Sequence, residues 1–261
     1  MTANVTPEKD ELQSMTMTPV EIALIVLAAL ILGFSKTGIS GGGVLVVPLL
    51  ASVFAGKTSM GVMLPMLIFG DVLATAYHGR RVHLPTLLKL LPWVMPGLVG
   101  GYFALDAIPS AWMARSLGAL VLVMLGLRIA QVKAGPRFAE HIPRRWWFSA
   151  VMGLLAGFAT MVGNLAGTIM TVYLLSMGAD KKRFMGTGTW YYLIVNLIKV
   201  PLYIRLGLFS AETLAVDLRA APVILLGGAA GVLVFRKIPQ EWFERIVLVL
   251  AAVAAVRLLF L

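Results

Sequence analysis

Residues 33–43 read GFSKTGISGGG and interrupt an apolar region that otherwise runs from residue 20 to residue 55. A second interruption, ATMVGNLAGT at residues 159–168, divides residues 146–177 in the same way. A transmembrane helix needs about 20 apolar residues, and the apolar pieces on either side of each interruption are shorter than that. We therefore expect each unit to form a broken helix or a re-entrant hairpin whose tip lies inside the membrane, where only protein or a water-filled cavity tolerates irregular backbone.

The composition is that of a polytopic membrane protein. Of the 261 residues, 59% are hydrophobic and 13% are charged, whereas soluble domains are about 45–50% apolar and about 25% charged. These values exclude a soluble enzyme and a disordered protein, and the absence of cysteine excludes a disulfide scaffold. Six further stretches are long enough to span the membrane: residues 58–77, 84–105, 111–131, 184–204, 218–235 and 240–261.

The two halves of the chain resemble each other. The pair Gly-Phe occurs at residues 33–34 and again at residues 157–158, in both cases just before an interruption. The pattern Ile-Pro-x-x-Trp-x-x-Arg occurs at residues 108–115 and again at residues 238–245, before the last apolar segment of each half. We therefore predict an all-α integral membrane protein of two repeats, each a helical hairpin followed by three transmembrane helices. Because three is odd, the second repeat is expected to be inverted relative to the first.

The expected organisation follows from this repeat. Residues 1–17 form a polar N-terminal tail, residues 18–131 the first transmembrane repeat, residues 132–145 a basic cytoplasmic linker and residues 146–261 the second transmembrane repeat. The tail lacks the charged-then-apolar order and the cleavage site of a signal peptide. We therefore expect the first hydrophobic segment to remain in the protein.

The basic residues favour hairpins that return to their own side of the membrane. With the N-terminus outside, this arrangement places 14 of the 22 Lys and Arg residues inside and 6 outside. A conventional eight-span chain with its N-terminus inside gives 12 against 8, a weaker positive-inside bias. We expect a multi-pass protein of the inner (plasma) membrane with both termini outside. The net charge of +10 reflects these loops, so no nucleic-acid partner is expected.

The interruptions favour a site for a small anion. Glycines let the backbone approach a ligand closely, and the helical pieces that begin near Gly42 and after Asn164 point their N-termini inward from opposite faces. A lysine inside the membrane is costly and usually functional, which favours Lys36 as a ligand. Two alternatives stay open: the glycines serve tight helix packing, and Lys36 reaches out to the interface. The expected substrate-binding residues are Lys36, Thr37, Ser40, Gly41, Gly42, Gly163, Asn164 and Thr168.

Asp71 and Lys199 lie well inside their helices. With a repeat offset of 125 residues, Asp71 superposes on Asn196 and Lys199 follows one turn later, so we expect Asp71 and Lys199 to approach each other. Both a structural salt bridge and a role in coupling fit this placement. An ionised, paired Asp71 leaves the charge of Lys36 for a monoanion, whereas an Asp71 that takes up a proton allows a dianion or proton coupling. The expected gating or coupling residues are Asp71, Asn196, Lys199, Thr187 and Trp190.

Residues 38–43, GISGGG, run into VVPLL at residues 46–50, and this resembles the glycine-rich segment of the sulfite exporter TauE/SafE family of membrane permeases. GTG at residues 186–188, followed by NLIKVP at residues 196–201, is similar to a subset of that family. The second interruption lacks the glycine pair usual there, which bears on how equally the two tips share the ligand. The resemblance implies the transport of sulfite, sulfonates or other small sulfur-containing or organic anions.

These features predict a secondary transporter that moves a small anion by alternating access around a site near the membrane midplane. We expect no cofactor and no metal; the expected partners are the anion and the lipid bilayer, and a co-transported proton or cation stays open. A passive anion channel is one alternative. An intramembrane enzyme using Asp71 and His78 is another, although seven residues on one helix place them about 10 Å apart, too far for a direct pair. Transport direction and oligomeric state are left open.

Overall fold

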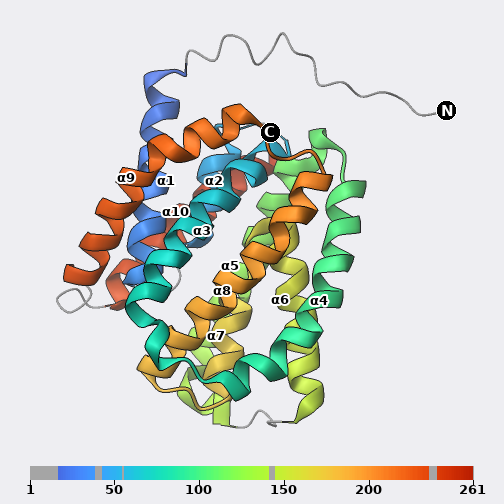
Figure 1. Cartoon of the computed structure of the whole chain (residues 1–261), viewed down its shortest axis with the longest axis vertical. Helices are drawn as coiled ribbons and strands as arrows, with labels where there is room; N and C mark the ends of the chain where they lie inside the picture. The colour runs from blue at the N-terminus through green and yellow to red at the C-terminus, as the bar shows by residue number, and fades with distance from the viewer. Residues whose placement is uncertain (1–16, 39–42, 55, 141–144, 235–239, 261) are drawn as a thin grey trace.

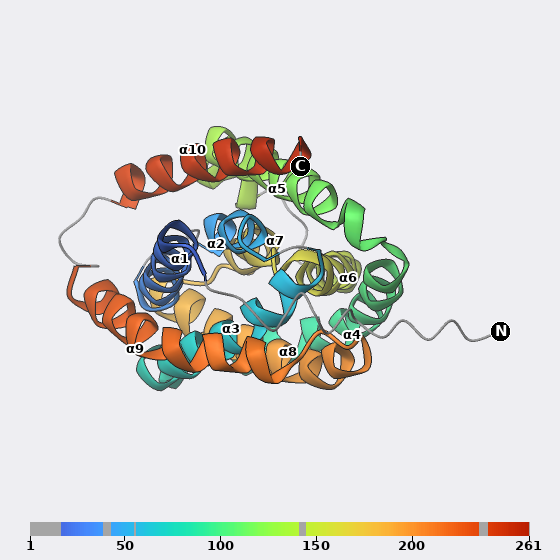
Figure 2. The ribbon, with the colours of Figure 1, turned by 90° about the horizontal axis from the view of Figure 1, so that it is seen from above.

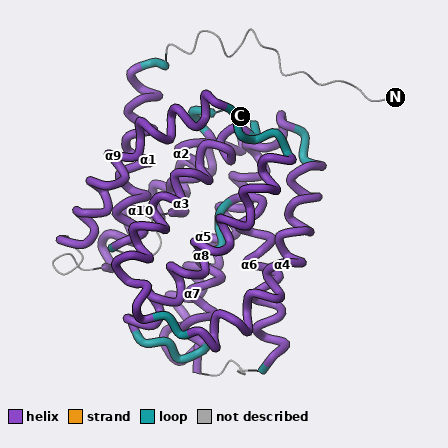
Figure 3. Tube along the Cα trace, in the orientation of Figure 1, coloured by secondary structure: helices purple, strands orange, loops and turns teal. Residues whose placement is uncertain are grey.

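The computed structural model describes residues 17–38, 43–54, 56–140, 145–234 and 240–260. These residues are helical apart from short loops and contain no strand (Figures 1 and 3), which confirms the predicted all-α class. The helices are α1 (Pro19–Thr37), α2 (Gly43–Ala51), α3 (Thr58–His78), the 3-10 helix η1 (Gly79–Arg81), α4 (Leu84–Ala107), α5 (Ser110–Glu140), α6 (Trp146–Gly163), α7 (Gly167–Ser176), α8 (Lys181–Arg205), α9 (Ala211–Val234) and α10 (Gln240–Leu259).

α1 and α6 are longer than the sequence analysis expects. α1 continues past Gly33 to Thr37, and α6 continues past Gly157 to Gly163. At 1.5 Å per residue these helices measure about 28 and about 27 Å, so the expectation that the pieces before the interruptions are too short to cross the membrane is wrong. Gly33 and Gly157 lie inside these helices, and both are at close helix–helix contacts.

These two glycines bring α1 against α9 and α6 against α4. A Cβ atom on Gly33 would lie 2.1 Å from the carbonyl oxygen of Ile224, and one on Gly157 would lie 2.3 Å from that of Val94. Only glycine allows two helix backbones to approach so closely. The two contacts occupy corresponding places in the two halves, since Val94 and Ile224 are separated by the same 130 residues as the Ile-Pro patterns.

α2 and α7 follow the long helices and have 9 and 10 residues. At lengths of about 14 and about 15 Å, neither can cross a membrane alone. The turn between α2 and α3 lies beside the turn between α4 and α5, where Lys57 Nζ donates to the Asp106 carbonyl at 2.9 Å. At the other end of the bundle, η1 lies beside the start of α8, where Trp190 Nε1 donates to the Gly79 carbonyl at 3.1 Å (Figure 1).

Six of the described helices are long and apolar enough to cross a membrane. Four of them match predicted spans. The other two are α1 and α6, which were not predicted to span the membrane, whereas α8 and α10 were predicted as spans and are not among the six. α8 has the length, but the polar run at residues 186–189 and Lys199 make it less apolar, and the apolar part described for α10 is Leu248–Leu259. α5 continues to Glu140, so much of the predicted linker at residues 132–145 is helical.

Seen from above, α1, α2, α7 and α6 form the middle of the molecule (Figure 2). α3 and α8 pack against each other on one side, and α5 and α10 do so on the other. α9 covers α1 at one end of the row, and α4 covers α6 at the opposite end. The described residues of both interruptions therefore lie inside a ring of helices.

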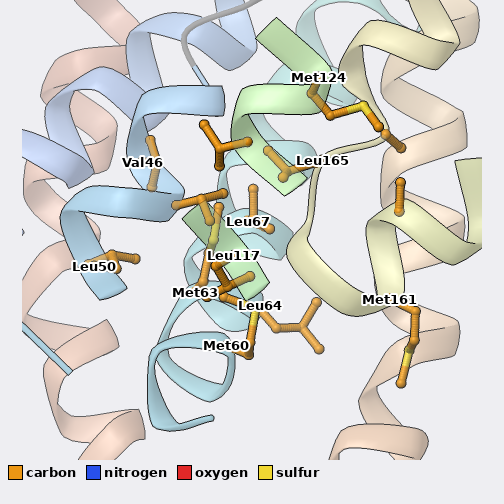
Figure 4. Close-up of a cluster of buried hydrophobic side chains, with 14 of the residues drawn as sticks. Val46, Leu50, Met60, Met63, Leu64, Leu67, Leu117, Met124, Met161 and Leu165 are labelled. Atoms are coloured by element: carbon orange, nitrogen blue, oxygen red, sulfur yellow. The ribbon is translucent and has the colours of Figure 1, made fainter. Parts of the chain in front are cut away.

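Buried methionine, leucine and valine side chains gather beside the connection between α6 and α7 (Figure 4). Residues of this cluster come from α2, α3, α5, the end of α6 and the connection to α7. Those labelled in Figure 4 are Val46, Leu50, Met60, Met63, Leu64, Leu67, Leu117, Met124, Met161 and Leu165. The irregular backbone at the interruption between α6 and α7 is thus surrounded by protein, the setting in which a membrane tolerates it.

Candidate functional site at the two interruptions

A cavity of about 120 Å³ lies where the two long helices end and the two short ones begin. The two interruptions contribute Ser35, Lys36, Gly43, Thr160, Asn164, Leu165, Gly167 and Thr168 to its lining. The remaining lining residues belong to α2, α3, α5, α7, α8 and α10. The two interruptions, which are more than 100 residues apart in the sequence, therefore share one cavity.

Asn164 ends α6 with a φ of 56°, in the left-handed region that asparagine tolerates better than most residues. Its backbone N–H donates to the carbonyl of Thr160 at 3.0 Å, and the N–H of Leu165 donates to the carbonyl of Ala159 at 3.2 Å. These bonds satisfy carbonyls at the end of α6 and turn the chain sharply toward α7.

Both short helices begin at the cavity. α2 starts at Gly43 and α7 starts at Gly167, and both glycines line the cavity wall. The first N–H groups of a helix have no partner inside that helix, and they carry a partial positive charge. The cavity is therefore bordered by two helix N-termini, as the sequence analysis expects.

Lys36 and Asp71 form an ion pair on the cavity wall. Lys36 Nζ lies 2.5 Å from Asp71 Oδ1, and it also lies 4.5 Å from the centre of the Tyr192 ring. The side chain of Asp71 is fully buried, whereas 15% of that of Lys36 is exposed. Asn196 Nδ2 donates to the other carboxylate oxygen of Asp71 at 2.7 Å. Both oxygens of the carboxylate are thus occupied.

Lys199 lies behind this pair and is fully buried. Its Nζ donates to Asn164 Oδ1 and to Asn196 Oδ1, the latter at 3.4 Å, and it lies 5.1 Å from the centre of the Tyr203 ring. Asn196 therefore stands between Asp71 and Lys199, which differs from the expected approach of those two residues. The direct partner of Asp71 is Lys36 because α1 remains helical through Lys36 and packs along α3.

The two lysine contacts join corresponding helices in the two halves. Lys36 and Asp71 join the end of α1 to α3, and Asn164 and Lys199 join the end of α6 to α8. The partners are 35 residues apart in both cases. The lysine lies on the interrupted unit in the first half and on the following long helix in the second. The sequence-based idea that Lys36 holds the spare positive charge is wrong, since Lys36 is paired and Lys199 has neutral partners.

Of the expected site residues, Lys36, Asn164, Thr168, Asp71 and Asn196 line the cavity. The expected residues Ser40, Gly41 and Gly42 lie outside the described part of the chain.

Four other expected residues make contacts elsewhere. Thr37 donates to the Gly228 carbonyl on α9 at 2.7 Å. A Cβ atom on Gly163 would lie 2.9 Å from a methyl carbon of Leu120 on α5.

The remaining two fasten the start of α8 to the η1 region. Thr187 Oγ1 accepts from the backbone N–H of His83 at 2.9 Å, and Trp190 donates to the Gly79 carbonyl. Neither is among the described residues of the cavity lining. Both connect the first turns of α8 to the chain between α3 and α4.

Arg128 and Tyr192 also line the cavity. Tyr192 belongs to the run at residues 187–192 that the sequence places at the start of a span facing the same cavity, whereas Arg128 is not expected there. In the sequence analysis Arg128 counts only as one of the basic residues that set the topology. It reaches the cavity because α5 stays helical well beyond it. Tyr192 lies next to the Gly-Thr-Gly-Thr run of α8, but only the packing of α8 against α3 brings its ring to Lys36.

The family model described as Sulfite exporter TauE/SafE matches residues 25–258 of the chain. This match includes both interruptions and every residue of the cavity lining. No curated protein and no solved structure matches the chain.

Proposed function

We propose, because this chain belongs to the sulfite exporter TauE/SafE family of membrane transporters, that it carries a small sulfur-containing or organic anion, such as sulfite or a sulfonate, across the membrane. Transport proceeds by alternating access of two inverted repeats around the shared cavity. The observation that carries this proposal is that Lys36 reaches the wall of a cavity at which two short helices begin.

The chemistry of the cavity suits an oxyanion. Lys36 supplies an ammonium group, Thr168 a hydroxyl and Asn164 an amide, and the helix starts at Gly43 and Gly167 supply backbone N–H groups. Helix N-termini and lysines are common ligands of anions in proteins. The oxygens of a sulfite or sulfonate group accept such donors from several directions at once.

The inverted repeat, with residues 18–131 as one unit and residues 146–261 as the other, is supported by the matching contacts of the two halves. The glycine contacts of α1 with α9 and of α6 with α4 correspond. The lysine contacts of α1 with α3 and of α6 with α8 correspond as well. Rocking of one unit against the other would expose the cavity to each side in turn.

The positive-inside rule assigns the η1 end of the bundle, with Arg80 and Arg81, to the cytoplasm. The cavity extends toward this end, where Phe184 and Met185 in the first turns of α8 line it. We therefore assign this form of the carrier to the state that faces the cytoplasm. The chain termini then lie outside, and the protein belongs to the inner (plasma) membrane.

The opposite end of the cavity is filled, which favours a carrier over a channel. Met60 and Leu64 lie on the turns of α3 between the cavity and the α2–α3 turn, and both are fully buried (Figure 4). A channel needs a continuous path, whereas a carrier keeps one side closed at a time. Asp71, Asn196 and Lys199 would couple anion binding to the opposite opening, and Thr187 and Trp190 would hold the cytoplasmic end of α8.

Flux into proteoliposomes tests this function. The purified full chain should take up or release sulfite or methanesulfonate at a rate that saturates with concentration. The double variant Lys36→Gln with Asp71→Asn removes the ligand lysine without leaving a buried carboxylate unpaired, and it should lose at least about 90% of the flux. Lys57→Gln, which removes a lysine at the α2–α3 turn, is the control and should keep wild-type flux.

Two results would contradict the proposal. If none of sulfite, sulfonates, sulfate and carboxylates is transported by the wild-type chain, the family-based substrate class fails. Flux that rises linearly with concentration, together with electrical conductance, would assign the protein to the channels.

A further inference from the structure

Lys36 faces both a carboxylate and the cavity. Its Nζ contacts Asp71 Oδ1, and its side chain is partly exposed on the cavity wall. An anion that enters the cavity approaches the same ammonium group. The carboxylate of Asp71 repels that anion and already uses the charge of Lys36. Tight binding of the anion therefore requires a second cation that balances Asp71.

Lys199 is such a cation. The oxygens that it contacts are the neutral amide oxygens of Asn164 and Asn196. A buried cation with neutral partners is costly inside a membrane. The Asn196 amide group donates to Asp71 Oδ2 and accepts from Lys199, so it links this cation to the carboxylate.

We propose that Asp71 is the counterion of Lys36 in the empty carrier and that the transported anion replaces Asp71 in this role. The positive charge of Lys199, which the Asn196 amide links to Asp71, then compensates the charge of the displaced carboxylate. This inference rests on the proposed function. With both lysines protonated and Asp71 ionised, this cluster of two lysines and one carboxylate carries a net charge of +1, which one bound monoanion offsets. Loading is thus an exchange of counterions on Lys36.

The exchange predicts how the anion preference changes with the charge of the cluster. A more positive cluster shifts the preference from a singly charged anion, such as a sulfonate, toward a doubly charged one, such as sulfate. Asp71→Asn raises the charge of the cluster by one, Lys199→Gln lowers it by one, and the two changes together restore it. Arg128 also lines the cavity, but it adds the same charge to every variant.

Calorimetric titration of the purified full-length protein with methanesulfonate and sulfate tests these assignments. Asp71→Asn should bind methanesulfonate about tenfold more tightly, and its affinity for sulfate should rise by a larger factor. Lys199→Gln should weaken methanesulfonate binding by at least about tenfold, although Lys199 is not among the described residues that line the cavity. The double variant should return to within about threefold of the wild type. Lys57→Gln should leave both affinities unchanged.

The inference is overturned if Asp71→Asn weakens methanesulfonate binding, or if the double variant binds no better than Lys199→Gln. If Asp71→Asn alone does not yield folded protein, the comparison of the double variant with Lys199→Gln is sufficient. These outcomes are separable from a failure of the proposed function. If the wild-type chain binds and transports anions but the affinities of the variants do not follow the predicted order, only the counterion exchange fails. If the wild-type chain binds no anion of the panel, both proposals fail.

Discussion

The two interruptions differ in where each obtains its positive charge. At the first, the lysine belongs to the interrupted unit itself, because Lys36 lies in the last turn of α1. At the second, the end of α6 carries the neutral Asn164, and the lysine comes from the neighbouring helix α8 as Lys199. The first lysine is partly exposed to the cavity and paired with a carboxylate, and the second is buried among amides.

This difference assigns different tasks to two similar pieces of structure. A lysine on the cavity wall can exchange one counterion for another. A lysine behind the cavity wall keeps its hydrogen-bond partners and affects anion binding only through its electrostatic charge. Two repeats with the same packing can therefore support an asymmetric site, since different residue types in the two halves put the cation on α1 in one and on α8 in the other.

The largest effect is expected at the glycines that the two halves share. Gly33→Ala and Gly157→Ala should each lower the stability by about 3 kcal/mol, because the added Cβ atoms meet backbone oxygens of α9 and α4 that cannot move aside. Thermal unfolding in detergent measures this loss. Gly126→Ala is the control; a Cβ atom there meets nothing within 4 Å, so a small gain is expected. Equal stability of all three variants would contradict the packing role.

A smaller effect should separate the two lysines. Lys36→Gln leaves a buried carboxylate without its cation and should cost about 2 kcal/mol of unfolding free energy, somewhat less than the usual loss for a broken buried pair because Lys199 lies nearby. Lys199→Gln leaves only neutral amides behind and should cost less than half as much. The same unfolding experiment compares them. A greater loss for Lys199→Gln would reverse our assignment of the paired lysine.

Asn164→Asp would make the second interruption resemble the first. An aspartate tolerates the left-handed backbone and gives Lys199 a charged partner, so the protein should become more stable by about 1–2 kcal/mol. The added negative charge should at the same time weaken anion binding, measured by titration with methanesulfonate. Asn164→Gly keeps the backbone free of strain and serves as the control for the loss of the side chain. Tighter anion binding by Asn164→Asp would argue against a role for the charge of the cluster.

The smallest effect is expected far from the cavity. Trp190→Phe removes the hydrogen bond to the Gly79 carbonyl, and the loss should be about 1 kcal/mol. If this contact holds the cytoplasmic end of α8 during transport, the maximal flux should change while the concentration for half-maximal flux stays the same. A change in the concentration for half-maximal flux, with no change in the maximal flux, would instead place Trp190 at the binding site.

The sequence by itself determined the membrane class, the all-α fold and the two regions in which helices are interrupted. Apolar content, glycine clusters and helix length are local properties, so they can be counted along the chain. The family motif around residues 38–50 and the lysine at residue 36 were visible for the same reason. Five of the residues expected at the site line one cavity, which residues of both interruptions share with α3 and α8.

Only the tertiary structure decided how far α1 and α6 extend and which charges form pairs. Gly33 looked like a helix end, but α9 packs so closely against it that the glycine is needed inside the helix. Asp71 pairs with Lys36 and not with Lys199, and Arg128 joins the cavity wall. These contacts depend on the rotation and crossing of helices that are far apart in the chain, and helix packing sets those quantities where local composition does not.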